Sequence, residues 1–309
     1  MHVSVMPRES LELLAVKPDG VYLDCTTGLG GHTRLIAERL TTGYVLANDR
    51  DQQSLAMARE NTAAVAERIC FHYGGFGSLA EAVSQAGFSK VDGLLADLGV
   101  SRYQLTEPSR GFSFMQDGPL DMRMDTRQPF SAADLLNTAS AEELARIFWE
   151  FGGERESRRF ARAIVRDREA KPFHTTRELA ELIERLDPRR GAKTHPATKV
   201  FQALRLAVND EIGSLQRGLE GAVKLLRPGG RLAVITFHSL EDRLVKDFGR
   251  VRTRDYTFTG GVDVPELREP RAPELSWVTP KAIKPRAQEL SENPRARSAQ
   301  LRALEKLTG

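Results

Sequence analysis

A carboxylate followed by a glycine-rich turn is the feature of this sequence best suited to hold a ligand. An apolar run ends at Asp24, the turn after it contains Gly28, Gly30 and Gly31, and residues 33–40 follow a helical pattern. In an open α/β sheet, such a turn presents backbone N–H groups to a nucleotide at the carboxyl end of the first strand. A tight turn without a ligand is the alternative interpretation.

The spacing of the glycines disfavours a cofactor that contains a diphosphate. The dinucleotide fingerprint G-x-G-x-x-G ends in Gly or Ala, but counting from Gly28 its last position is Thr33. Asp49 closes the next apolar run, where such folds place an acid that bonds ribose hydroxyls. An adenosine-bearing ligand without a pyrophosphate fits both observations, and S-adenosylmethionine is the commonest, so we expect that cofactor.

The elements around these residues predict a parallel α/β sheet. Strand patterns cover 21–24, 44–47, 69–73 and 91–97, and helical patterns cover 33–40, 52–66 and 79–86. This alternation is typical of βαβ units and predicts a Rossmann-like sheet. A long helical pattern over 197–226 and a strand pattern over 231–237 continue it, and residues 298–304 are a candidate edge strand.

The alternation stops between the fourth and fifth strand patterns, which predicts a helical domain inserted there. Residues 101–124 have a loop composition, and helical patterns cover 132–136, 141–151, 154–168 and 177–186, the last with a candidate cap at Thr175 or Thr176. We expect the sheet domain at 1–101 and 197–309, and the loop with the helical insertion at 102–196. Residues 250–297 are rich in Pro, Arg and Glu, which predicts a loosely structured segment.

Asp97 ends the fourth strand pattern and is the strongest candidate for catalysis, because sheet topology places its carboxylate over the ligand cleft. A helix-capping or turn aspartate is the alternative. An exocyclic base amine is a poor nucleophile, so a methyltransferase must orient it with hydrogen-bond acceptors and exclude water. Methylation at a pyrimidine carbon would call for a thiolate, a role that neither Cys25 nor Cys70 suits by position.

Candidate substrate-binding residues occur in two segments that come after Asp97 in the sequence. The loop 110–125 contains Phe112, Phe114 and Arg123, which suits stacking on unpaired bases and contact with phosphates, although a self-packed loop explains it too. Gln202, Arg205 and Asn209 share one side of the predicted helix 197–226, opposite its apolar stripe.

The residues after the fifth strand pattern face the same cleft as Asp97 by topology. Ser239 and Asp242 satisfy the capping-box pattern, which explains those two residues but leaves His238 as a second candidate for catalysis at the substrate pocket and Arg243 as a candidate for substrate binding.

Charge is distributed unevenly along the chain and favours a nucleic-acid partner. Residues 1–153 carry 13 Lys and Arg against 20 Asp and Glu, whereas residues 154–199 carry 13 against 8 and residues 243–309 carry 14 against 9. Arg155, Arg158, Arg159, Arg162 and Arg166 lie on one broad face of a predicted helix. Binding of an RNA backbone and simple solvation are both consistent with such a face.

Composition excludes several other classes. No apolar run approaches the ~18 residues of a membrane span and no signal pattern is present, so we expect a cytoplasmic protein without a membrane partner. The two cysteines and six histidines show no metal-ligand spacing, and we expect no metal. The sequence leaves open whether the chain forms a homo-oligomer.

With these residues in place, the chain resembles the ribosomal RNA small subunit methyltransferase H family from end to end. The resemblance rests on several long motifs: Gly30-Gly31-His32, Asp49-Arg50-Asp51, Asp97-Leu98-Gly99-Val100-Ser101, residues 111–125, His195-Pro196-Ala197-Thr198, Phe201-Gln202-Ala203-Leu204-Arg205, residues 237–243 and residues 293–298. It implies a class I methyltransferase that acts on the N4 amine of a cytosine in the decoding region (P site) of 16S rRNA, on the assembled small subunit.

The resemblance also implies which residues contact S-adenosylmethionine. They are Gly30, Gly31, His32, Asp49, Phe76, Asp97 and Gln104, with Phe76 placed to stack on adenine. The sequence departs from the family at Ser101-Arg102-Tyr103-Gln104, where Ser-Ser-Pro-Gln is usual, and this puts the contact of Gln104 in doubt. Lys199 replaces a common arginine, which removes any bidentate contact at that position.

Overall fold

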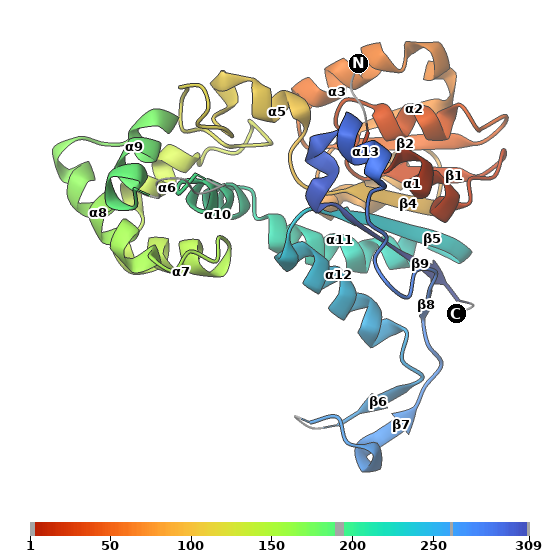
Figure 1. Cartoon of the computed structure of the whole chain (residues 1–309). Coiled ribbons are helices and arrows are strands. Elements are labelled where there is room, and N and C mark those ends of the chain that lie inside the picture. The colour runs from red at the N-terminus through yellow and green to blue at the C-terminus, as the bar shows by residue number, and fades with distance from the viewer. Residues whose placement is uncertain (1–3, 189–194, 260–261, 308–309) are drawn as a thin grey trace. The chain divides into compact units, whose positions relative to one another are not determined.

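The computed structural model describes residues 4–188, 195–259 and 262–307. The chain forms a sheet unit, Met1–Gly99 with Gly213–Gly309, and a helical unit, Val100–Ile212. The helical unit enters the chain between β4 (Val91–Asp97) and β5 (Leu226–Thr236), where the interrupted alternation predicts an insertion (Figure 1). It extends to Ile212 rather than to residue 196.

The sheet has the strand order β3-β2-β1-β4-β5-β9-β8. β1 (Val21–Asp24), β2 (Tyr44–Asp49), β3 (Ile69–Tyr73), β4 and β5 pair in parallel, whereas β9 (Gln300–Lys306) pairs antiparallel with both β5 and β8 (Leu275–Trp277). This is a Rossmann-like α/β fold, and the prediction of that fold class is confirmed. Because the winding reverses between β1 and β4, the carboxyl ends of these two strands form the expected ligand crevice.

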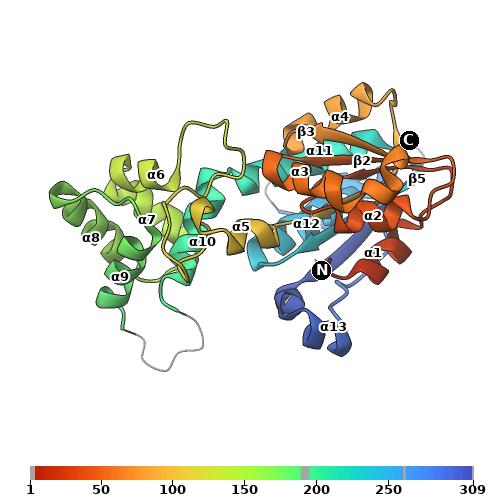
Figure 2. The ribbon, with the colours of Figure 1, turned by 90° about the horizontal axis from the view of Figure 1, so that it is seen from above.

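Helices cover both faces of the sheet (Figure 2). On one face, α4 (Leu79–Gln85), α11 (Glu211–Leu225) and α12 (Ser239–Arg252) pack on a cluster that includes Leu23 and Leu94. On the other face, α1 (Pro7–Leu14) and α2 (Gly31–Ala37) pack on a cluster that includes Tyr22 and Leu95. Burial of each such side chain contributes about 1.5–3 kcal/mol, so the sheet is a rigid base for its strand ends.

Helical segments lie on both sides of β3 in the sequence. α3 (Gln52–Asn61) is capped by the side chain of Asp51, which accepts hydrogen bonds from Gln53 N and Ser54 N, and it continues into η1 (Ala63–Arg68). η2 (Phe76–Ser78) leads into α4.

Residues 250–297 contain more regular structure than the composition predicts. They form a hairpin of β6 (Tyr256–Phe258) and β7 (Arg268–Pro270) that projects beyond α12, with η4 (Pro265–Leu267) between its strands, and then β8, α13 (Ala287–Glu292) and η5 (Pro294–Ser298) (Figure 1). β9 is an interior strand rather than an edge strand, because β8 covers its outer side. In β9, Arg302 forms a bidentate ion pair with Asp242 of α12 at 2.7 and 3.1 Å.

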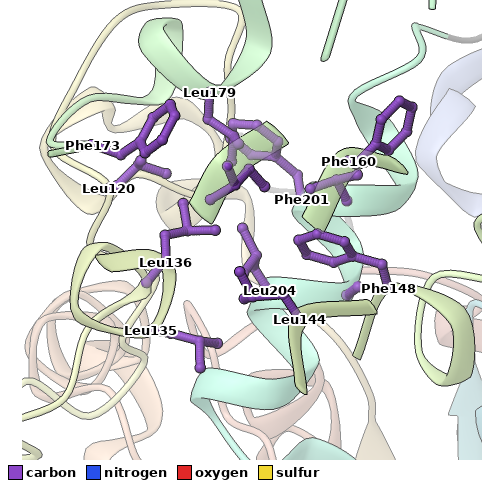
Figure 3. Packing of buried hydrophobic residues seen from close by; sticks show 14 of the residues in the cluster. Leu120, Leu135, Leu136, Leu144, Phe148, Phe160, Phe173, Leu179, Phe201 and Leu204 are labelled. Atoms are coloured by element: carbon purple, nitrogen blue, oxygen red, sulfur yellow. The ribbon is translucent and has the colours of Figure 1, made fainter. Parts of the chain in front are cut away.

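The helical unit has its own core. It consists of α5 (Arg102–Thr106), η3 (Pro108–Arg110), α6 (Ala132–Thr138), α7 (Ala141–Glu150), α8 (Ser157–Ala170), α9 (Thr176–Leu186) and α10 (Thr198–Val208). Figure 3 shows Phe148, Phe160 and Phe201 packed among leucines of this core. Thr175 forms a capping box with Glu178, which confirms the predicted cap of α9.

The prediction of one helix over 197–226 was wrong. The helix ends at Val208 and α11 begins at Glu211, because Asp210 adopts a φ of +44° that no α-helix contains. α10 buries Val200, Phe201 and Leu204 in the helical core, which is why the helical unit extends past residue 196.

Candidate functional site

Asp24 and Asp97 end the two strands on either side of the switch point. The buried carboxylate of Asp24 accepts hydrogen bonds from Thr33 Oγ1 at 2.6 Å and from Thr26 N at 3.2 Å. Thr26 Oγ1 in turn accepts from Asp97 N at 2.7 Å. This chain of hydrogen bonds ties the ends of β1 and β4 together at the crevice where folds of this topology bind their ligands.

The turn after β1 requires glycine at Gly30. Its φ is +84°, and a Cβ there would lie 2.9 Å from Cγ2 of Thr62 and 3.2 Å from Cβ of Ala58. Gly30 N donates to the Thr27 carbonyl at 2.8 Å, and α2 begins at the next residue. The glycine therefore lets the turn pack directly on α3 while its backbone faces the strand ends.

Asp49, at the end of β2, is joined to the same turn. Its Oδ2 accepts from Gly28 N at 2.7 Å, and its Oδ1 accepts from Asp51 N at 2.9 Å. Desolvation by burial raises the pKa of Asp49 to about 6, although both hydrogen bonds oppose that rise. Each oxygen keeps a lone pair for another donor, so the carboxylate suits the ribose hydroxyls for which the sequence predicts it.

His32 is a buried imidazole among carboxyl groups. Its Nε2 lies 3.6 Å from Oδ2 of Asp97, and within the described part of the chain neither ring nitrogen makes a hydrogen bond of standard geometry. Burial alone would lower the pKa of His32, but Asp97 and then Asp24 more than offset this, and the pKa is raised. The two carboxylates therefore favour the protonated form of His32 at the strand ends.

Asp97 has one carboxylate oxygen with an unused hydrogen-bonding capacity. Its Oδ1 is buried and accepts no hydrogen bond from the described residues, whereas Oδ2 faces His32. A buried acceptor without a partner is costly unless a ligand supplies the donor. Oδ1 is thus the acceptor in this crevice that is best placed for an amine.

Phe76 and Gln104 have structural partners of their own. Phe76 is half-buried and lies against α11, where a Cβ on Gly218 would come within 2.7 Å of Phe76 Cδ1. Gln104 belongs to the helical unit and is buried in a capping box: its Oε1 accepts from Ser101 N at 2.9 Å, and its backbone N donates to Ser101 Oγ at 3.2 Å. Their contacts with the cofactor stay predictions.

The residues after β5 differ from the predicted capping box. His238 is the N-cap of α12 and its Nδ1 accepts from Glu241 N at 3.5 Å, while Glu241 Oε2 accepts from Phe237 N at 2.8 Å. The box is therefore His238 with Glu241, and the prediction of Ser239 with Asp242 was wrong. His238 Nε2 also lies 3.0 Å from Glu241 Oε1, so this histidine has a local structural role, and its catalytic role stays a prediction. Arg243 is exposed.

Most of the predicted substrate residues in the helical unit have partners within that unit. Phe112 is buried in its core, and Phe114 stacks on His195 and Phe201 with ring centroids 4.7 and 4.8 Å apart. The loop is thus self-packed, which favours the alternative interpretation of these aromatics. Arg123 forms a bidentate pair with Asp121 at 2.8 Å.

Of the three candidates on or next to α10, Arg205 and Asn209 have partners within the helical unit, and Gln202 is partly exposed. Arg205 Nε pairs with Glu211 Oε1 at 2.8 Å. Asn209 is buried: its Oδ1 accepts from Met124 N at 2.7 Å and its Nδ2 donates to the Met122 carbonyl at 2.7 Å. Gln202 is partly exposed on the same helix. Substrate contact by these three residues stays a prediction.

The predicted arginine face of α8 is exposed. Arg158, Arg159, Arg162 and Arg166 point away from the core that Phe160 and Ile164 enter, and Arg155 precedes the helix. Arg159 pairs with Glu156 at 3.7 Å and Arg166 pairs with Asp167 at 2.7 Å. The face is therefore accessible to a polyanion.

Comparison with known proteins identifies the family of this chain. Residues 1–307 match the model of the MraW methylase family. The chain belongs to the MraW methylase family. It is 56% identical over 305 residues to a protein of Solibacter usitatus named "Ribosomal RNA small subunit methyltransferase H", with 99% of each chain covered. It is 46% identical to the protein of that name from Syntrophotalea carbinolica, with 99% of this chain and 98% of the relative covered.

A methylase of this family uses S-adenosylmethionine, and the residues of the crevice fit that cofactor. Asp49 offers a carboxylate with spare lone pairs, and Asp97 offers a buried oxygen that accepts no hydrogen bond. The cofactor carries two cationic groups, and the strand ends offer the buried carboxyl of Asp24 and the partly exposed carboxyl of Asp97 to balance such charge. In the described part of the chain, no cluster of three metal-ligating side chains is present and no helix is long and apolar enough to span a membrane.

The methylase crevice contains residues that the sequence did not single out. Thr26 and Thr33 hold Asp97 and Asp24 through hydroxyl groups, and only Thr26, two residues after Asp24 in the turn, carries a local signal that could have found it. Glu289, whose charge acts on both His32 and Asp97, lies far away in the sequence, and no local pattern indicates it.

Proposed function

We propose that this chain transfers a methyl group from S-adenosylmethionine to the N4 amine of a cytosine in the decoding region of 16S rRNA, on the assembled small ribosomal subunit. The observation that carries the proposal is the match over residues 1–307 to a methylase family whose relatives are named for small-subunit rRNA. The free oxygen of Asp97 at the switch point supports an amine as the acceptor.

Five residues of the sheet unit would hold the cofactor. The backbone of Gly30 and Gly31 and the carboxylate of Asp49 line the turn after β1 and the end of β2, and His32 with Asp97 completes the crevice. When bound, S-adenosylmethionine supplies an electrophilic methyl group. The enzyme then needs no nucleophile of its own, and no covalent intermediate is expected.

Asp97 orients the amine. Its Oδ1 accepts a hydrogen bond from the N4 amino group, which directs the nitrogen lone pair and limits its freedom. As the nitrogen gains a methyl group it becomes positively charged, and the Asp97 carboxylate stabilises that charge and can take the proton. His32, 3.6 Å away, holds Oδ2 so that Oδ1 stays directed at the substrate.

The helical unit contacts the rRNA. The arginines on and before α8 are exposed, and Trp149 on α7 is 58% exposed although aromatic side chains of that size are normally buried. Arginines bind phosphates and an exposed indole stacks on unpaired bases, the combination that grips single-stranded RNA. An rRNA substrate places the enzyme in the cytoplasm.

The test incubates the purified protein and labelled S-adenosylmethionine with small subunits from cells that lack the enzyme. Mass spectrometry of the digested rRNA identifies the product, and N4-methylated cytidine supports the proposal. Greater transfer to naked duplex DNA than to subunits would indicate a DNA methyltransferase instead. Tight subunit binding without any transfer would indicate an assembly factor that only senses the cofactor.

A further inference from the structure

The two ends of the sheet unit are fastened together beside the crevice. In α13, Glu289 Oε1 accepts a hydrogen bond from the backbone N of Met6 at 2.6 Å, and Arg286 pairs with Glu9 of α1 at 2.8 Å (Figure 1). Glu289 is half-buried and Glu9 is buried, although Arg286 is exposed, so the hydrogen bond to Met6 is the better shielded of the two contacts. These two contacts, Glu289–Met6 and Arg286–Glu9, join the C-terminal segment to the N-terminal segment, and we call them the clasp.

The clasped residue has a strained backbone. Met6 has a φ of +47°, which a non-glycine residue adopts only when its surroundings enforce it, and its side chain is fully buried. Val5 and Met6 pack in one cluster with Ile36 and Ala37 of α2, the helix that carries His32. The hydrogen bond to Glu289 therefore fixes the backbone conformation of Met6, whose side chain packs against α2.

The same segment acts on the crevice electrostatically. The Val5 backbone contributes to the raised pKa of His32, together with Asp97 and Asp24, although burial opposes them. Burial raises the pKa of Glu289, opposed by the bond from Met6, and the charges of Glu9, His32 and Asp97 also act on it. Glu289 thus belongs to the group of charges around His32.

We propose that Glu289 is a positioning residue for methyl transfer: through the backbone of Met6 it holds the N-terminal segment against α2, and so keeps His32 beside Asp97. The inference rests on the proposed function of the crevice. Glu289 acts through these residues and does not itself contact the amine.

The test uses three variants of the full chain that separate the hydrogen bond from the charge. Glu289→Gln keeps an acceptor for Met6 N but removes the charge, whereas Glu289→Asp keeps the charge on a side chain too short to reach. Glu292→Ala is the matched control, because Glu292 is exposed on the same helix and bonds only to Gln288 among the described contacts. Each variant is assayed for S-adenosylmethionine binding by calorimetry and for kcat and KM on unmethylated small subunits.

We expect Glu289→Asp to lose about tenfold or more in kcat, since small displacements near a reacting centre are costly. Glu292→Ala should keep kcat within about twofold of the unchanged protein, whereas Glu289→Gln should lose less than Glu289→Asp, because it keeps the acceptor for Met6 N. Equal loss in the Gln and Asp variants, or no loss in either, would overturn the proposal. If the unchanged protein binds no S-adenosylmethionine, the proposed function itself fails, and that result is distinct from a failure of the clasp.

Discussion

Nε2 of His32 lies 3.6 Å from Oδ2 of Asp97, and this contact joins the helix after β1 to the end of β4. Oδ1 of the same carboxylate remains buried without a hydrogen bond. One oxygen is therefore engaged by the protein and the other is left for a ligand, which is the arrangement that orientation of an amine requires.

Asp97→Asn should reduce methyl transfer by about a hundredfold or more, because the amide cannot stabilise the positive charge that develops on the amine. Binding of S-adenosylmethionine should weaken far less than methyl transfer, since Asp97 loses its charge but Asp49 and the glycine turn are unchanged. The measurement compares single-turnover rates with calorimetric affinities. It also includes the NMR shifts of His32, whose raised pKa should fall once the neighbouring charge is removed. A variant that transfers methyl groups at the normal rate would exclude Asp97 from catalysis.

The affinity for S-adenosylmethionine should depend on pH through Asp49. Its pKa is raised to about 6 by burial, so the carboxylate is ionised at pH 7 and becomes protonated in more acidic solution. Ribose hydroxyls donate better to the ionised form, so affinity should be constant above pH 7, fall as pH drops through about 6, and approach the weaker affinity of the protonated form. Calorimetry from pH 5 to pH 8 checks this, with Asp49→Asn as the control.

The Asn control should bind more weakly and lose the part of the pH dependence that belongs to Asp49. For stability the sign is opposite. Because the folded-state pKa is raised above the ordinary value, protonation of Asp49 favours folding, and its contribution is lost as pH rises through about 6. Parallel profiles for the two proteins would show that Asp49 does not govern binding.

Gly30 and Gly87 form a matched pair for the turn. Both have a positive φ, +84° and +82°, but a Cβ on Gly30 would lie 2.9 Å from Thr62 whereas a Cβ on Gly87 would meet nothing within 4 Å. Gly87→Ala should cost about 1 kcal/mol for the backbone alone, and Gly30→Ala should cost more. Denaturant unfolding measures both, and equal costs would mean that the turn relaxes away from α3.

Residue patterns predicted the parallel half of the sheet well because its strands are buried on both faces. The run before Asp24 is apolar, as are the three residues before Asp97, and the alternation with helices is regular. The same logic located the crevice, since the carboxyl ends of these strands meet at the switch point.

The remaining parts depend on contacts between distant residues. Nothing near Asp210 in the sequence indicates the φ of +44° that ends α10, because Asn209 bonds to Met122 and Met124 far back in the chain. β8 is short and exists through its pairing with β9. The clasp of Glu289 on Met6 spans 283 positions and has no local pattern.

The capping box of α12 gives a test of the structural assignment at the end of β5. Glu241→Ala should destabilise the fold by about 1–2 kcal/mol, because the Glu241 carboxylate accepts from the backbone N of Phe237 and of His238. Ser239→Ala should change stability by less than about 0.5 kcal/mol, since Ser239 is exposed. Thermal unfolding of the two variants is the measurement, and a larger loss at Ser239 would restore the box predicted from the sequence.

Asn209 and Gln202 distinguish structure from recognition on α10. Asn209→Ala removes a buried amide that satisfies Met124 N and the Met122 carbonyl, so it should cost about 2 kcal/mol or more and lower the melting temperature. Gln202→Ala should leave stability within about 0.5 kcal/mol, because this side chain is partly exposed. If Gln202 contacts the rRNA, Gln202→Ala should also raise KM for small subunits while kcat is retained. Asn209→Ala is assayed below its melting temperature. If its free energy of unfolding is unchanged and its KM for small subunits rises, Asn209 recognises the substrate.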